Sequence, residues 1–316
     1  MGRNIVWATK DYERQFGVGK GFGEKDEITV ESLIDSEHPV IRPRTIKAVA
    51  EQHRRSLEKG EVFTPSWICN QQNNLVDSAW FGMKGSPFNV ETFDDKTGRH
   101  GWKRTIQHVA SFPNGKTWLD YVFARRLEVA CGEAPYLTSR YDAVTGAWIP
   151  VEERIGFLDR KLRLVGEHFP RWGVGRWFEA AKWAVQSVYG FDWQGDNVLL
   201  ARENILFTVM EHYNSDFSSS GPFTEKAMLE LAEIVSWNIW QMDGVRFVVP
   251  NTCGIKPEEG TLGGELALLK PCCGCMKNDL WSHNGIRCKV KDWSTGQIEE
   301  FLPPRLKKMS IQEVCR

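Results

Sequence analysis

Four residues toward the C-terminal end of the sequence have the types and spacing of a metal site. Cys272 and Cys275 are separated by two residues, and His283 and Cys288 follow. Three thiolates and one imidazole form a tetrahedral ligand set for structural Zn²⁺. The polar segment is too short to fold without a metal, so we predict that these four residues bind zinc. Cys253 is a more distant reserve ligand, and reduced cysteines without any metal are the alternative.

A second stretch, residues 126–137, has the pattern of a short strand, a turn of small residues and the start of a helix. The strand carries an acid, Glu128. In α/β proteins, an acid at a strand end and the amides that follow it bind nucleotide-like ligands, and small residues let the backbone approach closely. The three-glycine dinucleotide pattern is absent. A buried strand and turn without a ligand is the alternative.

The same stretch resembles motif I of the N6-adenine DNA methyltransferases, which is roughly Leu-Glu/Asp-x-x-Cys-Gly-x-Gly-x-Phe-Leu. The matching residues are Leu127, Glu128, Cys131, Gly132 and Leu137. Ala134 stands at the second glycine of the motif, and Tyr136 stands at the aromatic position. In that family the loop binds S-adenosylmethionine. The resemblance therefore implies cofactor contacts at Glu128, Ala130, Cys131, Gly132 and Ala134.

Upstream, Val62-Phe63-Thr64-Pro65 resembles motif X of the same family, in which a Thr-Pro turn closes over the methionine end of the cofactor. From the residues alone, Thr64 is expected to cap a helix and Pro65 to lie in its first turn. The resemblance adds Thr64 and Pro65 to the expected cofactor site.

Two later acids complete the resemblance. Asp192 ends a short β-like run before a helix and resembles the motif II acid, which accepts hydrogen bonds from the ribose hydroxyls. Asp196 is the alternative at this position, or a simple helix cap. Asp243 resembles the motif III acid, which contacts the adenine amino group, although Asp243-Gly244 could equally form an ordinary turn.

The catalytic tetrapeptide of this family, Asn/Asp/Ser-Pro-Pro-aromatic, is missing. Pro303-Pro304 is preceded by Leu302 and followed by Arg305, so neither the polar acceptor nor the ring that stacks on the flipped base is present. We therefore expect the S-adenosylmethionine-binding component of a DNA N6-adenine methyltransferase of the restriction–modification type, with DNA and a second chain that carries the catalytic motif as partners. The alternative is a catalytically inactive DNA- or protein-binding module. A His-Asn-His nuclease is disfavoured because only the first two residues of that pattern occur.

These motifs predict an α/β fold with a Rossmann-like, mostly parallel sheet, helices on both faces and a zinc-binding appendage. The expected parts are an N-terminal arm and charged, solvated helix (1–60), a cofactor-binding domain (61–250, with a turn-rich insertion at about 82–118) and a basic zinc-binding tail (251–316). The net charge of −1 produces no overall attraction to nucleic acid. No long apolar run predicts a membrane span. Without an export signal, the expected location is the cytoplasm, where cysteines stay reduced.

Overall fold

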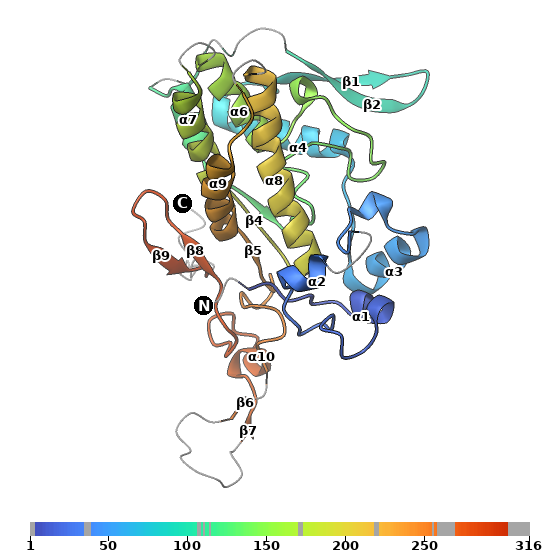
Figure 1. Ribbon diagram of the computed structural model, residues 1–316. Coiled ribbons are helices and arrows are strands. Elements are labelled where there is room, and N and C mark those ends of the chain that lie inside the picture. Colours follow the sequence, from blue (N-terminus) through green and yellow to red (C-terminus); the bar gives the residue numbers. More distant parts are fainter. Residues whose placement is uncertain are drawn as a thin grey trace, which may run out of the picture. The chain divides into compact units, whose positions relative to one another are not determined.

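A parallel sheet lies at the centre of the N-terminal part of the chain (Figure 1). Its strand order is β3-β4-β5, and the three strands run in the same direction. Parallel strands require long crossover connections, which helices supply here. The carboxyl ends of the strands therefore meet at one edge, where ligands bind in such folds. The strands are β3 (Arg126–Val129), β4 (Val188–Asp192) and β5 (Ile239–Gln241).

This computed structural model describes residues 4–34, 39–105, 109, 111–113, 115–169, 173–217, 221–254, 256–257 and 269–302. The chain divides into an N-terminal unit, Met1–Gly244, and a C-terminal unit, Val245–Arg316. Among the described residues, no helix is long and apolar enough to cross a membrane.

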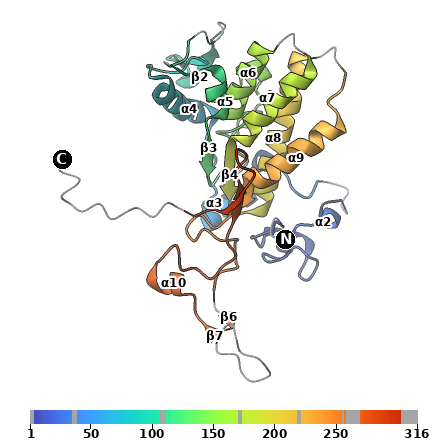
Figure 2. The same ribbon diagram turned by 90° about the vertical axis from the view of Figure 1, so that its left-hand side faces the viewer.

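Four helices form the crossovers and pack against one another beside the sheet (Figure 2). In α8, the buried residues Val198, Ala201, Ile205 and Val209 recur every three or four positions, so one face of the helix packs inward. The mixed α/β architecture with a parallel sheet agrees with the prediction. The crossover helices are α6 (Phe157–His168), α7 (Val174–Gln186), α8 (Gly195–Asp216) and α9 (Glu225–Asn238).

One face of the edge strand β3 is open in the described part of the chain. Leu127 and Val129 are 47% and 63% exposed, whereas Glu128, which points to the opposite face, is buried. The expectation of helices on both faces of the sheet therefore does not hold at this strand.

The N-terminal segment is folded, so the expectation of a flexible arm is wrong. Trp7 and Tyr12 are buried. The amide N–H of Val6 donates to Gln241 Oε1 (2.9 Å), and Gln241 Nε2 donates back to the Val6 carbonyl (2.8 Å), which attaches the segment to the end of β5. The helices of this region are α1 (Asp11–Phe16), α2 (Val30–Ile34) and α3 (Val49–Lys59), with a 3-10 turn at Arg44–Ile46.

The predicted turn-rich insertion contains an antiparallel hairpin. Its strands are β1 (Asn89–Asp94) and β2 (Arg99–Arg104). The hairpin follows α4 (Ser66–Phe81) and packs against it, and α5 (Trp118–Phe123) then leads into β3.

The C-terminal unit consists of short elements. They are the antiparallel pair β6 (Lys256–Pro257) and β7 (Leu269–Lys270), the helix α10 (Cys273–Lys277), and the antiparallel pair β8 (Lys289–Lys291) and β9 (Ile298–Glu300). The segment from Pro303 onward, which carries much of the predicted basic tail, lies outside the described residues.

Candidate cofactor pocket and metal centre

A cavity of about 480 Å³ lies at the carboxyl ends of β3 and β4. The segment between α3 and α4 forms one wall, and the ends of the two strands with the loops that follow them form the other. The lining residues are 58–64, Glu128, 130–132, Pro135, Tyr136, 192–194 and Asn197.

The loop after β3 is held by the neighbouring strand. The N–H of Cys131 donates to the Phe191 carbonyl (2.8 Å), and the N–H of Gly132 donates to Asp192 Oδ2 (2.9 Å). Ala130, Gly132 and Ala134 have φ values of 51°, 53° and 63°, in the left-handed region that favours glycine. Ala134 therefore has a left-handed backbone conformation, which glycine adopts with less strain.

Replacing Ala130 by glycine is expected to stabilise the protein. An alanine in the left-handed region is strained, and relief of this strain should outweigh the added flexibility of the unfolded chain, for a net gain of about 0.5–1 kcal/mol. Urea unfolding measures this gain as a higher midpoint concentration, with an unchanged dependence of the unfolding free energy on urea. Ala79→Gly, at an exposed position of the helix α4, should lower stability by about 1 kcal/mol. A loss of stability in both variants would contradict the left-handed backbone at Ala130.

Glu128 accepts hydrogen bonds from the backbone of the loop that follows β3. Its carboxylate accepts the N–H of Leu137 (3.2 Å) and of Tyr136 (3.4 Å). Burial raises the pKa of Glu128 well above its ordinary value, although the two amides oppose this shift. The residue therefore positions the loop and also offers a carboxyl group to the cavity.

Asp192 connects both strands at the cavity. Its Oδ1 accepts the N–H of Gln194 (2.9 Å) and Asn197 Nδ2 (3.4 Å), while Oδ2 accepts the N–H of Gly132. Burial raises the pKa of Asp192 to about 6, against the effect of these donors. Asp192 therefore changes charge in mildly acidic solution.

The segment before α4 lines one side of the cavity. The ring of Phe63 lies 3.6 Å from the position that a β-carbon on Gly132 would occupy, and the guanidinium of Arg44 lies 5.0 Å from the centre of that ring. The N-cap position of α4 is Pro65 and no side chain caps the helix, so the prediction that Thr64 caps it is wrong. The first amide of α4, Ser66 N–H, instead donates to Asp142 Oδ2 (2.7 Å).

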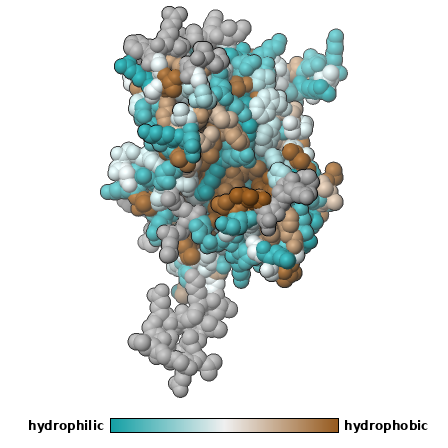
Figure 3. All heavy atoms as spheres, in the orientation of Figure 1, coloured by the Kyte–Doolittle hydropathy of each residue, from teal (hydrophilic) through white to brown (hydrophobic). Residues whose placement is uncertain are grey.

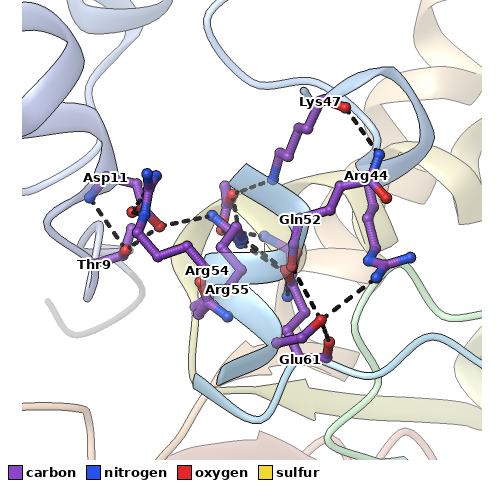
Figure 4. Close-up of polar contacts among 12 residues, drawn as sticks. Thr9, Asp11, Arg44, Lys47, Gln52, Arg54, Arg55 and Glu61 are labelled. Atoms are coloured by element: carbon purple, nitrogen blue, oxygen red, sulfur yellow. Dashed lines mark hydrogen bonds and ion pairs between the residues drawn. The ribbon is translucent and has the colours of Figure 1, made fainter. Parts of the chain in front are cut away.

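A buried ion network fixes this wall to α8 (Figure 4). Lys47 Nζ and Arg55 Nη2 each lie 2.9 Å from Asp196 Oδ2, and Arg55 Nε lies 2.7 Å from Glu61 Oε2. Asn197 Nδ2 also donates to Glu61 (3.0 Å). Burial would raise the pKa of Asp196, but the two cations hold it well below its ordinary value.

This network corrects two sequence-based expectations. The region that was expected to form a solvated helix contributes fully buried Arg55, and Asp196 is bound by cations instead of lining the cavity. Two cations of α6, Arg160 and Lys161, are also buried. Arg160 pairs with buried Asp77.

Asp243 does not line the cavity. The turn that contains it packs on Phe191, since a β-carbon at Gly244 would lie 2.9 Å from that ring. Consecutive strand residues point to opposite faces, so the ring of Phe191 and the carboxylate of Asp192 lie on different sides of β4.

The structure thus brings together most, but not all, of the predicted cofactor residues. Those that line the cavity are Thr64, Glu128, Ala130, Cys131, Gly132 and Asp192; those that do not are Pro65, Ala134 and Asp243. Glu61, Phe63 and Asn197 also line the cavity and were not predicted. The first two lie beside Thr64 in the sequence, which could have indicated them, whereas no local signal exists for Asn197.

The C-terminal unit holds a cluster of four potential metal ligands. The ligand atoms of Cys253, Cys272, Cys275 and His283 all lie within 4.8 Å of one another. Cys253 Sγ is 3.2 Å from Cys272 Sγ, 3.5 Å from Cys275 Sγ and 3.3 Å from His283 Nδ1. Zinc–ligand bonds of about 2.0–2.3 Å in a tetrahedron place the ligand atoms roughly 3.5 Å apart. The cluster could therefore hold a metal ion such as zinc.

Cys253 takes the place that the sequence analysis gave to Cys288. The antiparallel bridge between Val248 and Arg287 brings the two segments together, and Asn284 Nδ2 donates to the Gly254 carbonyl (2.8 Å) beside Cys253. Cys288 is buried but lies outside the four-residue cluster.

Gly274 explains the close approach of the ligands. A β-carbon at this position would lie 2.6–2.7 Å from the backbone nitrogen and ring of His283. Only glycine therefore allows α10 to approach the imidazole. The N–H of Asn284 also donates to Cys272 Sγ (3.4 Å), as expected for a support of a metal-bound thiolate.

Comparisons with protein-family models, curated proteins and solved structures give no match for this chain.

Proposed function

We propose that the chain is the S-adenosylmethionine-binding component of a DNA N6-adenine methyltransferase, with zinc as a structural ion in the C-terminal unit. The observation that carries the proposal is the cavity between the Thr64 segment, the Glu128 loop and Asp192. It joins three segments that resemble family motifs and that are far apart in the sequence.

The chemistry of the cavity suits this cofactor. Its volume of about 480 Å³ lies within the range of small-molecule sites. The carboxylate of Asp192 has about four acceptor sites, and three of them accept hydrogen bonds from the chain itself. One site therefore remains for a ribose hydroxyl, and the negative charge favours a cationic sulfonium ligand. Phe63 offers an apolar surface beside the polar groups.

Methyl transfer requires groups that this sequence lacks. A partner chain would supply the acceptor that binds the adenine amine and the ring that stacks on the flipped base. The cofactor component would then hold the methyl group in line with the amine. The exposed side chains of Leu127 and Val129 on one face of β3 support such a partner, because exposed apolar surface favours association.

Calorimetric titration of S-adenosylmethionine into the full chain tests the proposal. Binding should be tightest above pH 6, where Asp192 is ionised, and about tenfold weaker at pH 5, because only the ionised fraction binds well. Asp192→Asn should weaken binding at pH 7 and remove most of the pH dependence. Asp95→Asn, at an exposed turn, should change neither. A folded wild type that fails to bind would overturn the cofactor role.

The isolated chain should transfer no methyl group to DNA. Transfer of a radioactive methyl group by the chain alone would show that it carries its own catalytic residues.

A second candidate is an inactive binding module. The observation that favours it is that both oxygens of Asp192 already accept hydrogen bonds from the chain itself, so the cavity can be stable without a ligand. Absence of cofactor binding in a folded sample would support this candidate.

A further inference from the structure

The hairpin β1–β2 has an inner face that is attached to the body of the N-terminal unit. The ring of His100 stacks on Trp67 of α4, with ring centres 4.2 Å apart. Trp102 Nε1 donates to the Glu153 carbonyl (2.7 Å), and Asn74 Nδ2 donates to Glu91 Oε1 (3.0 Å). These contacts fix which face of the ribbon points outward.

The outer face carries two cations, Arg99 and Lys103, together with Gly101 and Thr92, the exposed Val90 opposite Lys103 and the acid Asp94 opposite Arg99. Residues alternate between faces along each strand, so Arg99 and Lys103 lie on the face opposite His100 and Trp102. Between the two cations, Gly101 lies opposite Thr92 in the strand pair and has no side chain that would project from this face. Both cations are exposed, as is Lys96 in the turn.

These three cations are available to an outside partner. Among the described residues, Lys96, Arg99 and Lys103 form no ion pair. The nearby carboxylate of Asp94 is engaged within the turn, where it accepts the N–H of Lys96 (2.9 Å) and the Thr97 hydroxyl (2.8 Å). In the view of Figure 3, the end of the hairpin projects as a hydrophilic extension.

The hairpin contacts the helix that begins beside the proposed cofactor cavity. Trp67, on which His100 stacks, belongs to the first turn of α4 and follows Thr64 by three residues. Thr64 lines the cavity. A polyanion that lies along the outer face of the hairpin would thus pass near the end of α4 at which the cavity lies.

We propose that the outer face of the hairpin β1–β2 binds the phosphate backbone of duplex DNA through Lys96, Arg99 and Lys103. This inference rests on the proposed function, since it assigns the DNA contact of the same enzyme. The charges are complementary, and Arg99 and Lys103 are about 14 Å apart along an extended strand, which spans several phosphates. Contacts of this kind set position and affinity and carry no sequence preference.

The test compares two triple variants of the full chain by fluorescence anisotropy with a labelled duplex of random sequence. Replacing Lys96, Arg99 and Lys103 by alanine should weaken binding at moderate salt by at least about tenfold, and should lower the slope of log affinity against log salt by about 2–3. The control replaces three other exposed lysines, Lys20, Lys25 and Lys226, and removes the same charge. It should change affinity by no more than about twofold, because distant charges are screened.

Three results would overturn the inference. The first is no DNA binding by the wild type, and the second is an equal loss of DNA affinity in both triple variants. The third is binding of polyglutamate that is as tight as that of DNA and depends on the hairpin, which would assign the surface to acidic polypeptides. Calorimetry with S-adenosylmethionine separates this inference from the proposed function. The hairpin variant should bind the cofactor like the wild type, so failure of cofactor binding and failure of DNA binding are independent readouts.

Discussion

Removal of the metal by a chelator is expected to unfold the C-terminal unit and leave the N-terminal unit folded. The C-terminal unit has few buried apolar residues in its described part, with Val248 the principal one, and its strands are two or three residues long. Structural zinc in small domains contributes about 10–16 kcal/mol of apparent binding free energy, which is folding free energy where no folded apo state exists. Metal analysis should find about one zinc per chain, and hydrogen exchange should show loss of protection only beyond Gly244 after chelation.

Cysteine variants separate the structural ligand set from the set predicted from sequence. Cys253→Ser and Cys275→Ser should each lose the metal, whereas Cys288→Ser should keep it. Cys273→Ser is the matched control, because this exposed cysteine adjoins the cluster without belonging to it. Full zinc content in Cys253→Ser, with loss in Cys288→Ser, would restore the sequence-based set.

Asp196→Asn is expected to cost about 3–5 kcal/mol of unfolding free energy at neutral pH. The substitution leaves buried Lys47 without its carboxylate partner and removes one partner of Arg55, which keeps Glu61. Breaking one side of a buried ion pair has this cost. Total stabilities are only about 5–15 kcal/mol, so the variant should be near the limit of folding. Urea unfolding measures the difference, and the exposed Asp95→Asn should change stability by no more than about 0.5 kcal/mol.

The effect of Asp196 should depend on pH in one direction. The pKa of Asp196 is lowered in the folded protein, so its contribution is complete above the ordinary value of 3.8 and decreases as the pH falls below it. The difference between wild type and Asp196→Asn should therefore shrink in strong acid. A difference that grew there, or a fully stable variant at pH 7, would contradict the buried network.

Local signals were sufficient to predict the central elements. The run that ends at Asp192 and the helix that follows are strand β4 and helix α8, because apolar spacing and the small-residue turn are encoded over short stretches. The same holds for the turn-rich insertion. Its closely spaced glycines and aspartates predict turns, and the structure has an antiparallel hairpin there.

Long-range partners could not be predicted. Lys47 and Arg55 resemble solvent-facing residues on a polar helix, and their partner Asp196 is 149 and 141 residues away in the sequence. The choice between Cys253 and Cys288 also depends on a distant strand contact, between Val248 and Arg287, and ligand spacing does not specify it. For Asp243, the resemblance to a motif identified the residue in the sequence but could not predict its place in space. That place depends on the packing of its turn on Phe191.

The bonds between Val6 and Gln241 have a consequence for biosynthesis. The two residues are 235 positions apart, so at ordinary elongation rates the N-terminal segment waits roughly 10–50 s on the ribosome for its partner. During this time Trp7 and Tyr12, buried in the final structure, have no completed site to occupy. Although it is made first, the N-terminal segment must be among the last parts to dock. The cavity wall that depends on α8 can close only once that late-emerging helix is available.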